Sequence, residues 1–215
     1  MHIVLDLHEV NVVNIEADRM LESILESLSK MEYVKSSEIP NIDLYMDQVL
    51  TFMNGHLEGV KRYESDKVMT KTMINNYAKN HLLPAPEKKK YTKEHIMVLM
   101  FIYYFKSILS IGDIQNILNP LTERYFANGK ELNLEKIYQE VFSLEKGQIE
   151  QLKENLTRDF QRAGETFKEE AQEDKEFLQL FSFICMLSYD IYIRKQIIEK
   201  IVDTMPKQAE KKTEK

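Results

Sequence analysis

A short stretch near the middle of the chain, residues 70–80, carries polar side chains suited to contact with nucleic acid. Its apolar residues Met73, Ile74 and Tyr77 recur at helical spacing, and Thr70 is suited to the N-cap, so a helix with one buried face is predicted. Ammonium, hydroxyl and amide groups bond phosphates, and Asn can also pair with the edge of adenine in the major groove. These groups belong to Lys71, Thr72, Asn75, Asn76 and Lys79. The pattern predicts a DNA-binding helix, with an ordinary solvated helix face as the alternative.

A basic turn follows this helix. Pro84 and Pro86 bracket it, and Lys88, Lys89 and Lys90 come next. Residues 60–95 hold nine Lys or Arg against four Asp or Glu, a net charge of +5, within a chain whose net charge is −6. A basic island in an acidic chain is the electrostatic footprint expected of a surface that binds nucleic acid. The turn therefore adds three lysines to the predicted DNA-binding set.

The same region resembles the DNA-binding domain of MerR-type transcription regulators. The resemblance is carried, in chain order, by Ile74-Asn75-Asn76-Tyr77, Leu82-Leu83-Pro84, Tyr91-Thr92, Leu99, Phe101-Ile102, Ser110-Ile111, Ile114 and Leu118. It implies a winged helix-turn-helix in which residues 70–80 form the recognition helix and residues 84–90 the wing. The chain departs from the pattern in having Asn75-Asn76 in place of Arg-Tyr, His81 in place of Gly, and a longer first turn over residues 55–67.

A second resemblance is closer and covers residues 36–120. Residues 39–48, together with residues 69–118, are similar to a bacterial YkrK-like family of unknown function. This likeness implies a fold and no established activity.

Helical periodicity dominates the rest of the chain, so the predicted fold class is all-α. Helices are expected over residues 16–34, 40–54, 92–105, 111–118, from 133 onward and over 175–205, while only residues 3–7 and 84–91 look extended. The predicted domains are an N-terminal arm and helix (1–35), the MerR-like winged helix-turn-helix domain (36–120), a helical dimerisation or effector domain (121–206) and a disordered tail (207–215). Cys185, within the last helix, is expected to be a small core residue.

No pattern in the sequence indicates catalysis or a cofactor. It contains no Gly-rich phosphate loop, no GxSxG and no HExxH, and its five His are scattered. The single Cys excludes an internal disulfide framework and a multi-thiolate metal site. Residues 1–15 do not resemble a signal peptide, and the apolar run over residues 177–192 is too short to span a bilayer. We therefore expect a cytoplasmic protein that is not an enzyme and needs neither a metal nor a cofactor.

These features lead to two alternative functions. The first is a DNA-binding transcription regulator that acts as a homodimer on double-stranded DNA, with a C-terminal domain for dimerisation or for a small-molecule effector that no motif identifies. The second is a helical protein-interaction module that keeps the winged shape but has lost DNA binding. The surface that separates them consists of Lys71, Thr72, Asn75, Asn76, Lys79, Lys88, Lys89 and Lys90.

Overall fold

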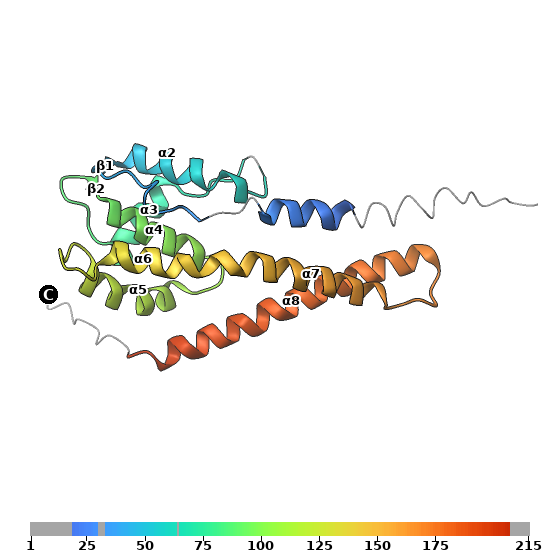
Figure 1. Cartoon of the computed structure of the whole chain (residues 1–215). Helices are drawn as coiled ribbons and strands as arrows, with labels where there is room; N and C mark the ends of the chain where they lie inside the picture. Colours follow the sequence, from blue (N-terminus) through green and yellow to red (C-terminus); the bar gives the residue numbers. More distant parts are fainter. Residues whose placement is uncertain (1–18, 30–32, 64, 207–215) are drawn as a thin grey trace, which may run out of the picture. The chain divides into compact units, whose positions relative to one another are not determined.

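The computed structural model describes residues 19–29, 33–63 and 65–206, and most of them are helical (Figure 1). The predicted all-α class is confirmed. The chain divides into a larger unit, Tyr33–Ser143 with Ile193–Lys215, and a smaller unit, Met1–Glu32 with Leu144–Tyr192. The strand predicted at residues 3–7 lies outside the described residues.

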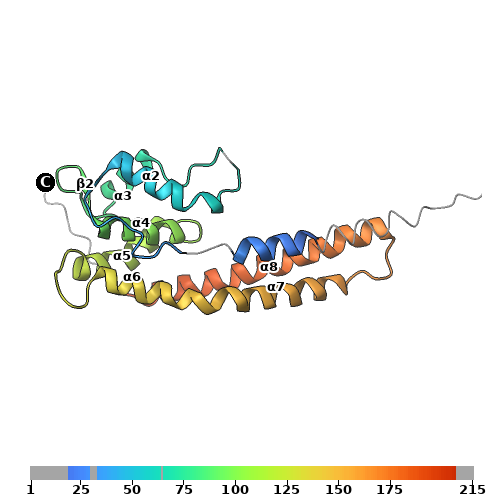
Figure 2. The same ribbon diagram turned by 45° about the horizontal axis from the view of Figure 1, so that its top comes forward.

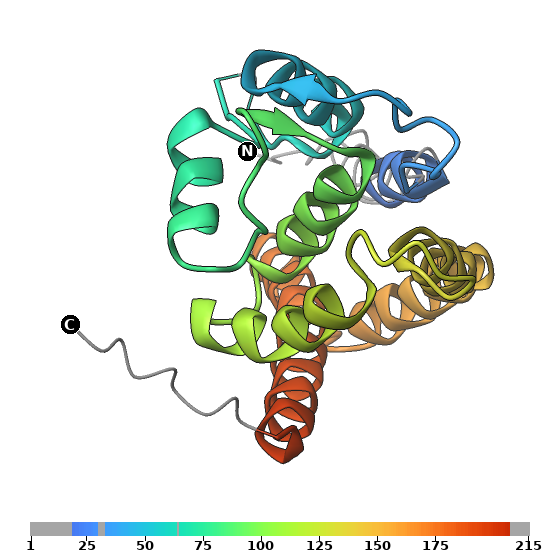
Figure 3. The ribbon, with the colours of Figure 1, turned by 90° about the vertical axis from the view of Figure 1, so that its left-hand side faces the viewer.

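Among its described residues, the larger unit contains a two-stranded antiparallel sheet, five complete α-helices, one 3-10 helix and the end of α8 (Gln172–Thr204). In chain order its elements are β1 (Leu44–Tyr45), α2 (Met46–His56), the 3-10 helix η1 (Glu58–Val60), α3 (Lys71–Lys79), β2 (Lys90–Tyr91), α4 (Lys93–Phe105), α5 (Ile111–Tyr125) and α6 (Leu134–Ser143). The sheet pairs Leu44 with Tyr91 and Tyr45 with Lys90. The arrangement of these elements is drawn from a second side in Figure 3.

Helix α4 forms the centre of the larger unit. Every residue from His95 to Ile102 is buried, which agrees with a helix that is apolar on nearly all sides. Its neighbours in the core come from α2, α3, α5 and α6, including Met53, Ile74, Leu118 and Tyr138. The helices around α4 each pack one apolar face into the core around it. Their opposite faces point to solvent.

The helix predicted over residues 40–54 begins six residues later than expected, at Met46. Leu44 and Tyr45 are extended instead, because they pair with β2. The backbone N–H of Tyr45 then donates to the Gln48 side chain at 2.9 Å, which caps the start of α2. The helix also continues past the predicted stop at Gly55 and ends at His56.

The helix predicted over residues 111–118 extends to Tyr125 and contains Pro120. Proline removes one backbone hydrogen bond from a helix interior. The helix nevertheless continues, because Leu121 and Tyr125 in its last turns pack against the core. Helix α6 belongs to the same core through Leu134 and Tyr138, so the larger unit extends beyond the predicted domain boundary at residue 120.

The smaller unit contains a helix over residues 19–29, the 3-10 helix η2 (Leu144–Gly147), α7 (Gln148–Gly164) and most of α8 (Gln172–Thr204). Near the loop that joins them, α7 and α8 lie next to each other (Figures 1 and 2). The Phe160 and Phe183 rings meet edge to face at a centroid distance of 5.3 Å, and the Gln179 amide donates to the carbonyl oxygen of Gly164 at 2.7 Å.

The expectation that Cys185 is a core residue is wrong, because its side chain is exposed. The apolar residues of α8 cover more than one face, whereas α7 covers only one of them. Within the described part of the chain, α8 is the helix whose length and apolar composition would be sufficient to cross a membrane, and 6% of the apolar window is buried.

Candidate nucleic-acid interface

Helix α3 carries the central part of the predicted site. The Thr70 hydroxyl accepts a hydrogen bond from the backbone N–H of Met73 at 3.2 Å, so the predicted N-cap is confirmed. On the inner side of the helix, Ile74 is fully buried, and Met73 and Tyr77 are partly buried against the core. The five predicted side chains are all exposed: Lys71, Thr72, Asn75, Asn76 and Lys79. The helix therefore presents these five together and is attached to the core by its other face.

The C-terminal end of α3 is closed by a Schellman turn. The backbone N–H of Leu82 donates to the carbonyl oxygen of Tyr77 at 2.9 Å, and that of His81 donates to Ala78 at 3.2 Å. His81 has φ of +55°, in the left-handed region where this motif usually has Gly. The turn directs the chain inward, so that Leu82 and Leu83 are buried directly after the exposed helix.

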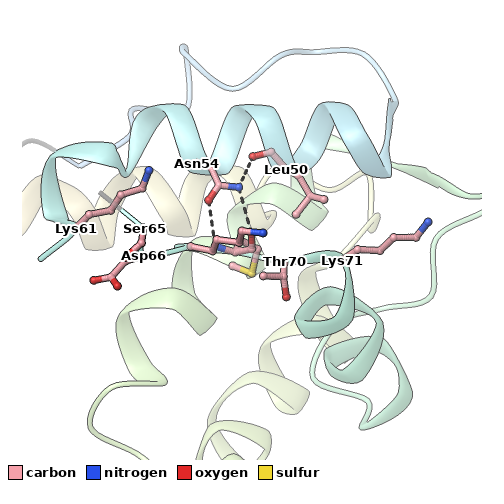
Figure 4. Close-up of a pocket in the computed structure, with 9 residues that line it drawn as sticks. Leu50, Asn54, Lys61, Ser65, Asp66, Thr70 and Lys71 are labelled. Carbon is pink, nitrogen blue, oxygen red and sulfur yellow. Dashed lines mark hydrogen bonds between the residues drawn. The ribbon is translucent and has the colours of Figure 1, made fainter. Parts of the chain in front are cut away.

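The N-terminal end of α3 is held by Asn54, a residue of α2. Its amide nitrogen donates to the carbonyl oxygen of Met69 at 3.2 Å, and its amide oxygen accepts from the Met69 backbone N–H at 3.3 Å (Figure 4). Both backbone groups of Met69 are thus satisfied by one side chain fifteen residues earlier in the chain. We call this pair of bonds the Asn54 clamp.

Two further side chains bind the backbone beside α3. The Lys106 ammonium, at the end of α4, donates to the carbonyl oxygen of Val68 at 2.8 Å, and burial lowers the pKa of this lysine. The Gln115 amide of α5 donates to the carbonyl oxygen of Asn80 at 2.5 Å. Together with the Asn54 clamp, these bonds attach the segments on both sides of α3 to three other helices.

The predicted wing is a tight hairpin turn. Glu87 and Lys90 form an antiparallel bridge, and the backbone N–H of Lys90 donates to the carbonyl oxygen of Glu87 at 2.8 Å. The two residues between them, Lys88 and Lys89, have φ of +47° and +64°. Positive φ at both central positions is the requirement of a type I′ turn, which normally uses Asn and Gly. Lys88 and Lys89 are exposed at the tip, whereas Lys90 is half-buried and its ammonium lies 5.8 Å from the centroid of the Tyr45 ring.

His95 lies in the first turn of α4 and packs against β2, the strand that follows the Lys88–Lys89 hairpin turn. Its ring meets Tyr91 edge to face at 5.5 Å and Phe126 at 4.8 Å, and the residue is 3% exposed. Nδ1 accepts from the backbone N–H of Thr92 at 3.0 Å, so the neutral ring has its proton on Nε2. Within the described residues, Nε2 has no hydrogen-bond partner of good geometry. Burial lowers the pKa of His95 to about 4, although the backbone at Ala85 and Pro84 favours the protonated form.

An open pocket of about 600 Å³ lies beside the start of α3. Its lining comes from α2, from the loop before α3 and from the first residues of α3 (Figure 4). Three of the side chains that line it are basic, Lys61, Lys67 and Lys71, and one is acidic, Asp66. Lys61 forms an ion pair with Glu58 at 3.6 Å, so Lys67, Lys71 and the positive end of the α3 dipole are the main positive groups beside this pocket.

The structure thus brings the eight predicted residues into two groups: five on the exposed face of α3 and three at the hairpin. The chain between the groups, residues 80–87, contains the Schellman turn and the buried Leu82 and Leu83. Sequence reasoning missed Asn54, Lys106 and Gln115, whose partners are between fifteen and thirty-eight residues away along the chain. Of these three residues only Asn54 stands out in the sequence, where it is predicted to mark the end of a helix. No group of residues that could hold a metal ion occurs in the part of the chain that the structure describes.

Comparison with known proteins identifies one family. The family model described as "Domain of unknown function (DUF1836)" matches residues 34–141, which include α3, the hairpin and the core around α4. No curated protein and no solved structure shows significant similarity to the chain.

Proposed function

The chain belongs to the DUF1836 family, and we propose that it is a transcription regulator that binds double-stranded DNA through α3 and the Lys88–Lys90 hairpin. In this proposal α3 is the recognition helix of a winged helix-turn-helix that resembles MerR-type regulators, and the hairpin is its wing. The protein would act in the cytoplasm, without enzymatic activity, metal or cofactor.

The observation that carries the proposal is the division of α3 into two faces. Five polar or basic side chains are exposed along it, and Ile74 on the opposite side is fully buried. A helix that enters the major groove needs such a polar outer face, and it must be supported from behind so that its contacts keep one register. The Asn54 clamp and the Lys106 and Gln115 bonds supply this support at both ends of the helix.

The residue types on α3 suggest how the contacts would be divided. Recognition helices of this kind contact bases mainly through their N-terminal residues, which here include Lys71, Thr72 and Asn75. An Asn at this place can donate to and accept from adenine, whereas Lys79, one turn further on, is suited to a phosphate. No Arg occurs on α3, so bidentate guanidinium contacts are absent from this helix and phosphate contacts would rest on lysine.

The hairpin supports the proposal through its backbone conformation. Lysine is an unfavourable residue at positive φ, yet two consecutive lysines occupy both central positions of the turn. Asn-Gly would make the same turn at lower free energy. Two lysines at the exposed tip of the turn place two ammonium groups where they can contact phosphate oxygens. We infer that this contact is the reason for lysine at these positions.

Fluorescence anisotropy with DNA fragments from the protein's own genomic neighbourhood tests the proposal. If the bound protein neutralises about six phosphates, the slope of log affinity against log salt is expected near −5. Lys79→Ala should reduce the slope by about one unit per bound protomer without changing sequence preference. Asn75→Ala should instead relax the preference at one base pair by about 1–3 kcal/mol.

A matched control is Lys200→Ala, which removes an exposed lysine of α8 and should leave both slope and preference unchanged. Absence of binding to any fragment, or binding that does not depend on salt, would refute the proposal. That outcome would favour the second function, a protein-interaction module with the winged shape.

A further inference from the structure

We propose that the outward face of α8 between Phe177 and Tyr192 binds the same face of a second copy of this chain. The proposal assigns a surface to the homodimer expected from the sequence, and it is argued from α8 alone, without reference to DNA binding by α3. It would therefore remain valid if α3 bound no DNA.

Helix α8 has two apolar faces in the smaller unit, and α7 covers one of them. Phe183 is 4% exposed and meets Phe160 of α7. Gln179 donates to the carbonyl oxygens of Gly164, the last residue of α7, and of Thr166, just after it. On the other side, large apolar side chains are between 39% and 67% exposed: Phe177, Leu180, Phe181, Ile184, Tyr189, Ile191 and Tyr192. Most of them are three or four positions apart, so they form a stripe along one side of the helix.

The exposed area of this stripe matches that of a protein interface. At roughly 150–200 Å² for each large side chain, the seven together expose on the order of 600–800 Å² per chain. A standard specific interface buries about 800 Å² on each partner, whereas the largest apolar patch of an ordinary monomer is about 300–600 Å². Two copies of the stripe therefore supply the area that a stable dimer needs.

The sequence of the stripe favours self-association. Phe177, Phe181, Ile184, Ser188 and Ile191 follow the alternating four- and three-residue spacing of a coiled-coil seam. None of the stripe residues is charged, so the surface offers no charge complementarity to a strongly acidic or basic partner. A two-fold dimer requires a surface that fits itself, and an uncharged apolar seam meets this requirement.

The alternative occupant is a lipid bilayer, and the packing of α8 argues against it. By length and composition alone α8 could cross a bilayer, so it is the helix packed on it that argues against insertion. Helix α7, which packs on the other face, carries the ion pairs Lys153–Glu150 and Arg162–Asp159. An inserted α8 would either bring these charges into lipid or lose its contacts with α7.

The test is the mass of the full-length protein in solution, measured by light scattering between about 1 and 100 µM without DNA. We expect a dimer. Ile184→Glu places a carboxylate in the middle of the stripe and should weaken the dimer about a hundredfold or more, because the buried charge would have no partner. The matched control Gln161→Glu adds the same charge at an exposed site on α7 and should leave the dimer intact.

Two further readouts keep the result interpretable. Ile184 is 51% exposed, so circular dichroism and thermal unfolding of Ile184→Glu should show an intact fold. Cys185 is the only cysteine and lies at the centre of the stripe, so a bis-maleimide reagent should link two chains in either a parallel or an antiparallel pairing. Ile184→Glu should abolish this cross-link.

Three results would overturn the proposal. They are a monomer throughout the concentration range, a dimer unaffected by Ile184→Glu, and a protein that partitions onto vesicles of phosphatidylcholine and phosphatidylglycerol through this face. Because none of these measurements involves DNA, a failure of dimerisation is distinguishable from a failure of DNA binding, which is read from the α3 variants.

Discussion

His95 should make the stability of the larger unit depend on pH below neutrality. The residue is 3% exposed, and burial lowers its pKa in the folded protein to about 4, against 6.5 for the ordinary value. Between these two values the unfolded chain binds a proton at this site and the folded chain does not. The free energy of unfolding therefore falls as the pH falls from about 6.5 to about 4.

The size of this effect follows from the shift. Each pH unit in the window removes about 1.4 kcal/mol, so the full loss is about 3 kcal/mol, a large part of the 5–15 kcal/mol typical of a domain. His95→Gln is the informative substitution, because a Gln side chain can still accept from the Thr92 backbone N–H in a capping box but does not titrate. Its unfolding free energy should lack this component of the pH dependence.

Urea unfolding followed by circular dichroism at several pH values between 4 and 7 measures the difference between the two proteins. The wild type should lose about 3 kcal/mol relative to His95→Gln across this range, while an NMR titration of the His95 ring should give a pKa near 4. Carboxylates that titrate in the same range affect both proteins and cancel in the difference. A difference that stays constant with pH would refute the reasoning, as would a His95 pKa near 6.5.

Three further substitutions test the backbone around the site. Lys89→Gly should raise the free energy of unfolding by about 1 kcal/mol in thermal or urea unfolding, because Gly adopts the φ of +64° without strain; an unchanged stability would mean that the turn is not strained. His81→Gly should stabilise by a similar amount, since His81 occupies the Gly position of the Schellman turn at φ of +55°; destabilisation would show that the His81 side chain makes a compensating contact. Asn54→Ala should destabilise the fold by about 1–3 kcal/mol, because both backbone groups of the buried Met69 lose their partners. It should also speed amide hydrogen exchange in α3, and unchanged exchange would show that the clamp does not hold the helix.

The features that the sequence predicted well are those decided by near neighbours in the chain. The N-cap Thr70 and the apolar residues Met73, Ile74 and Tyr77 lie within eight residues, and together they specify both the start and the buried face of α3. The continuous apolar run of α4 likewise predicted a helix enclosed on all sides. The exposure of the five residues on α3 follows from the same periodicity, whereas their binding to DNA remains a prediction.

Features that depend on distant partners were missed. The strand at Leu44 forms only because Tyr91 pairs with it, and the periodicity of residues 40–54 contains no sign of that pairing. The exposure of Cys185 is a similar case, because an apolar helix is buried only on as many sides as it has neighbours. The hydrophobicity of a helix shows how much of its surface is better buried than exposed. It does not show whether the rest of the same chain has elements that can cover that surface.

The Asn54 clamp has a consequence for the loop that it closes. The chain between the end of α2 at His56 and the start of α3 at Lys71 forms this loop. Because Asn54 binds Met69 directly, the position of α3 is set by the clamp and not by the path of this loop. Closing a loop twice as long costs only about 0.6 kcal/mol more in chain entropy. Leu57 at the start of the loop is buried in the core, but the exposed residues 62, 63 and 65–67 can change sequence or accept an insertion while α3 stays in place. They are therefore the natural position for an inserted tag or sensor peptide.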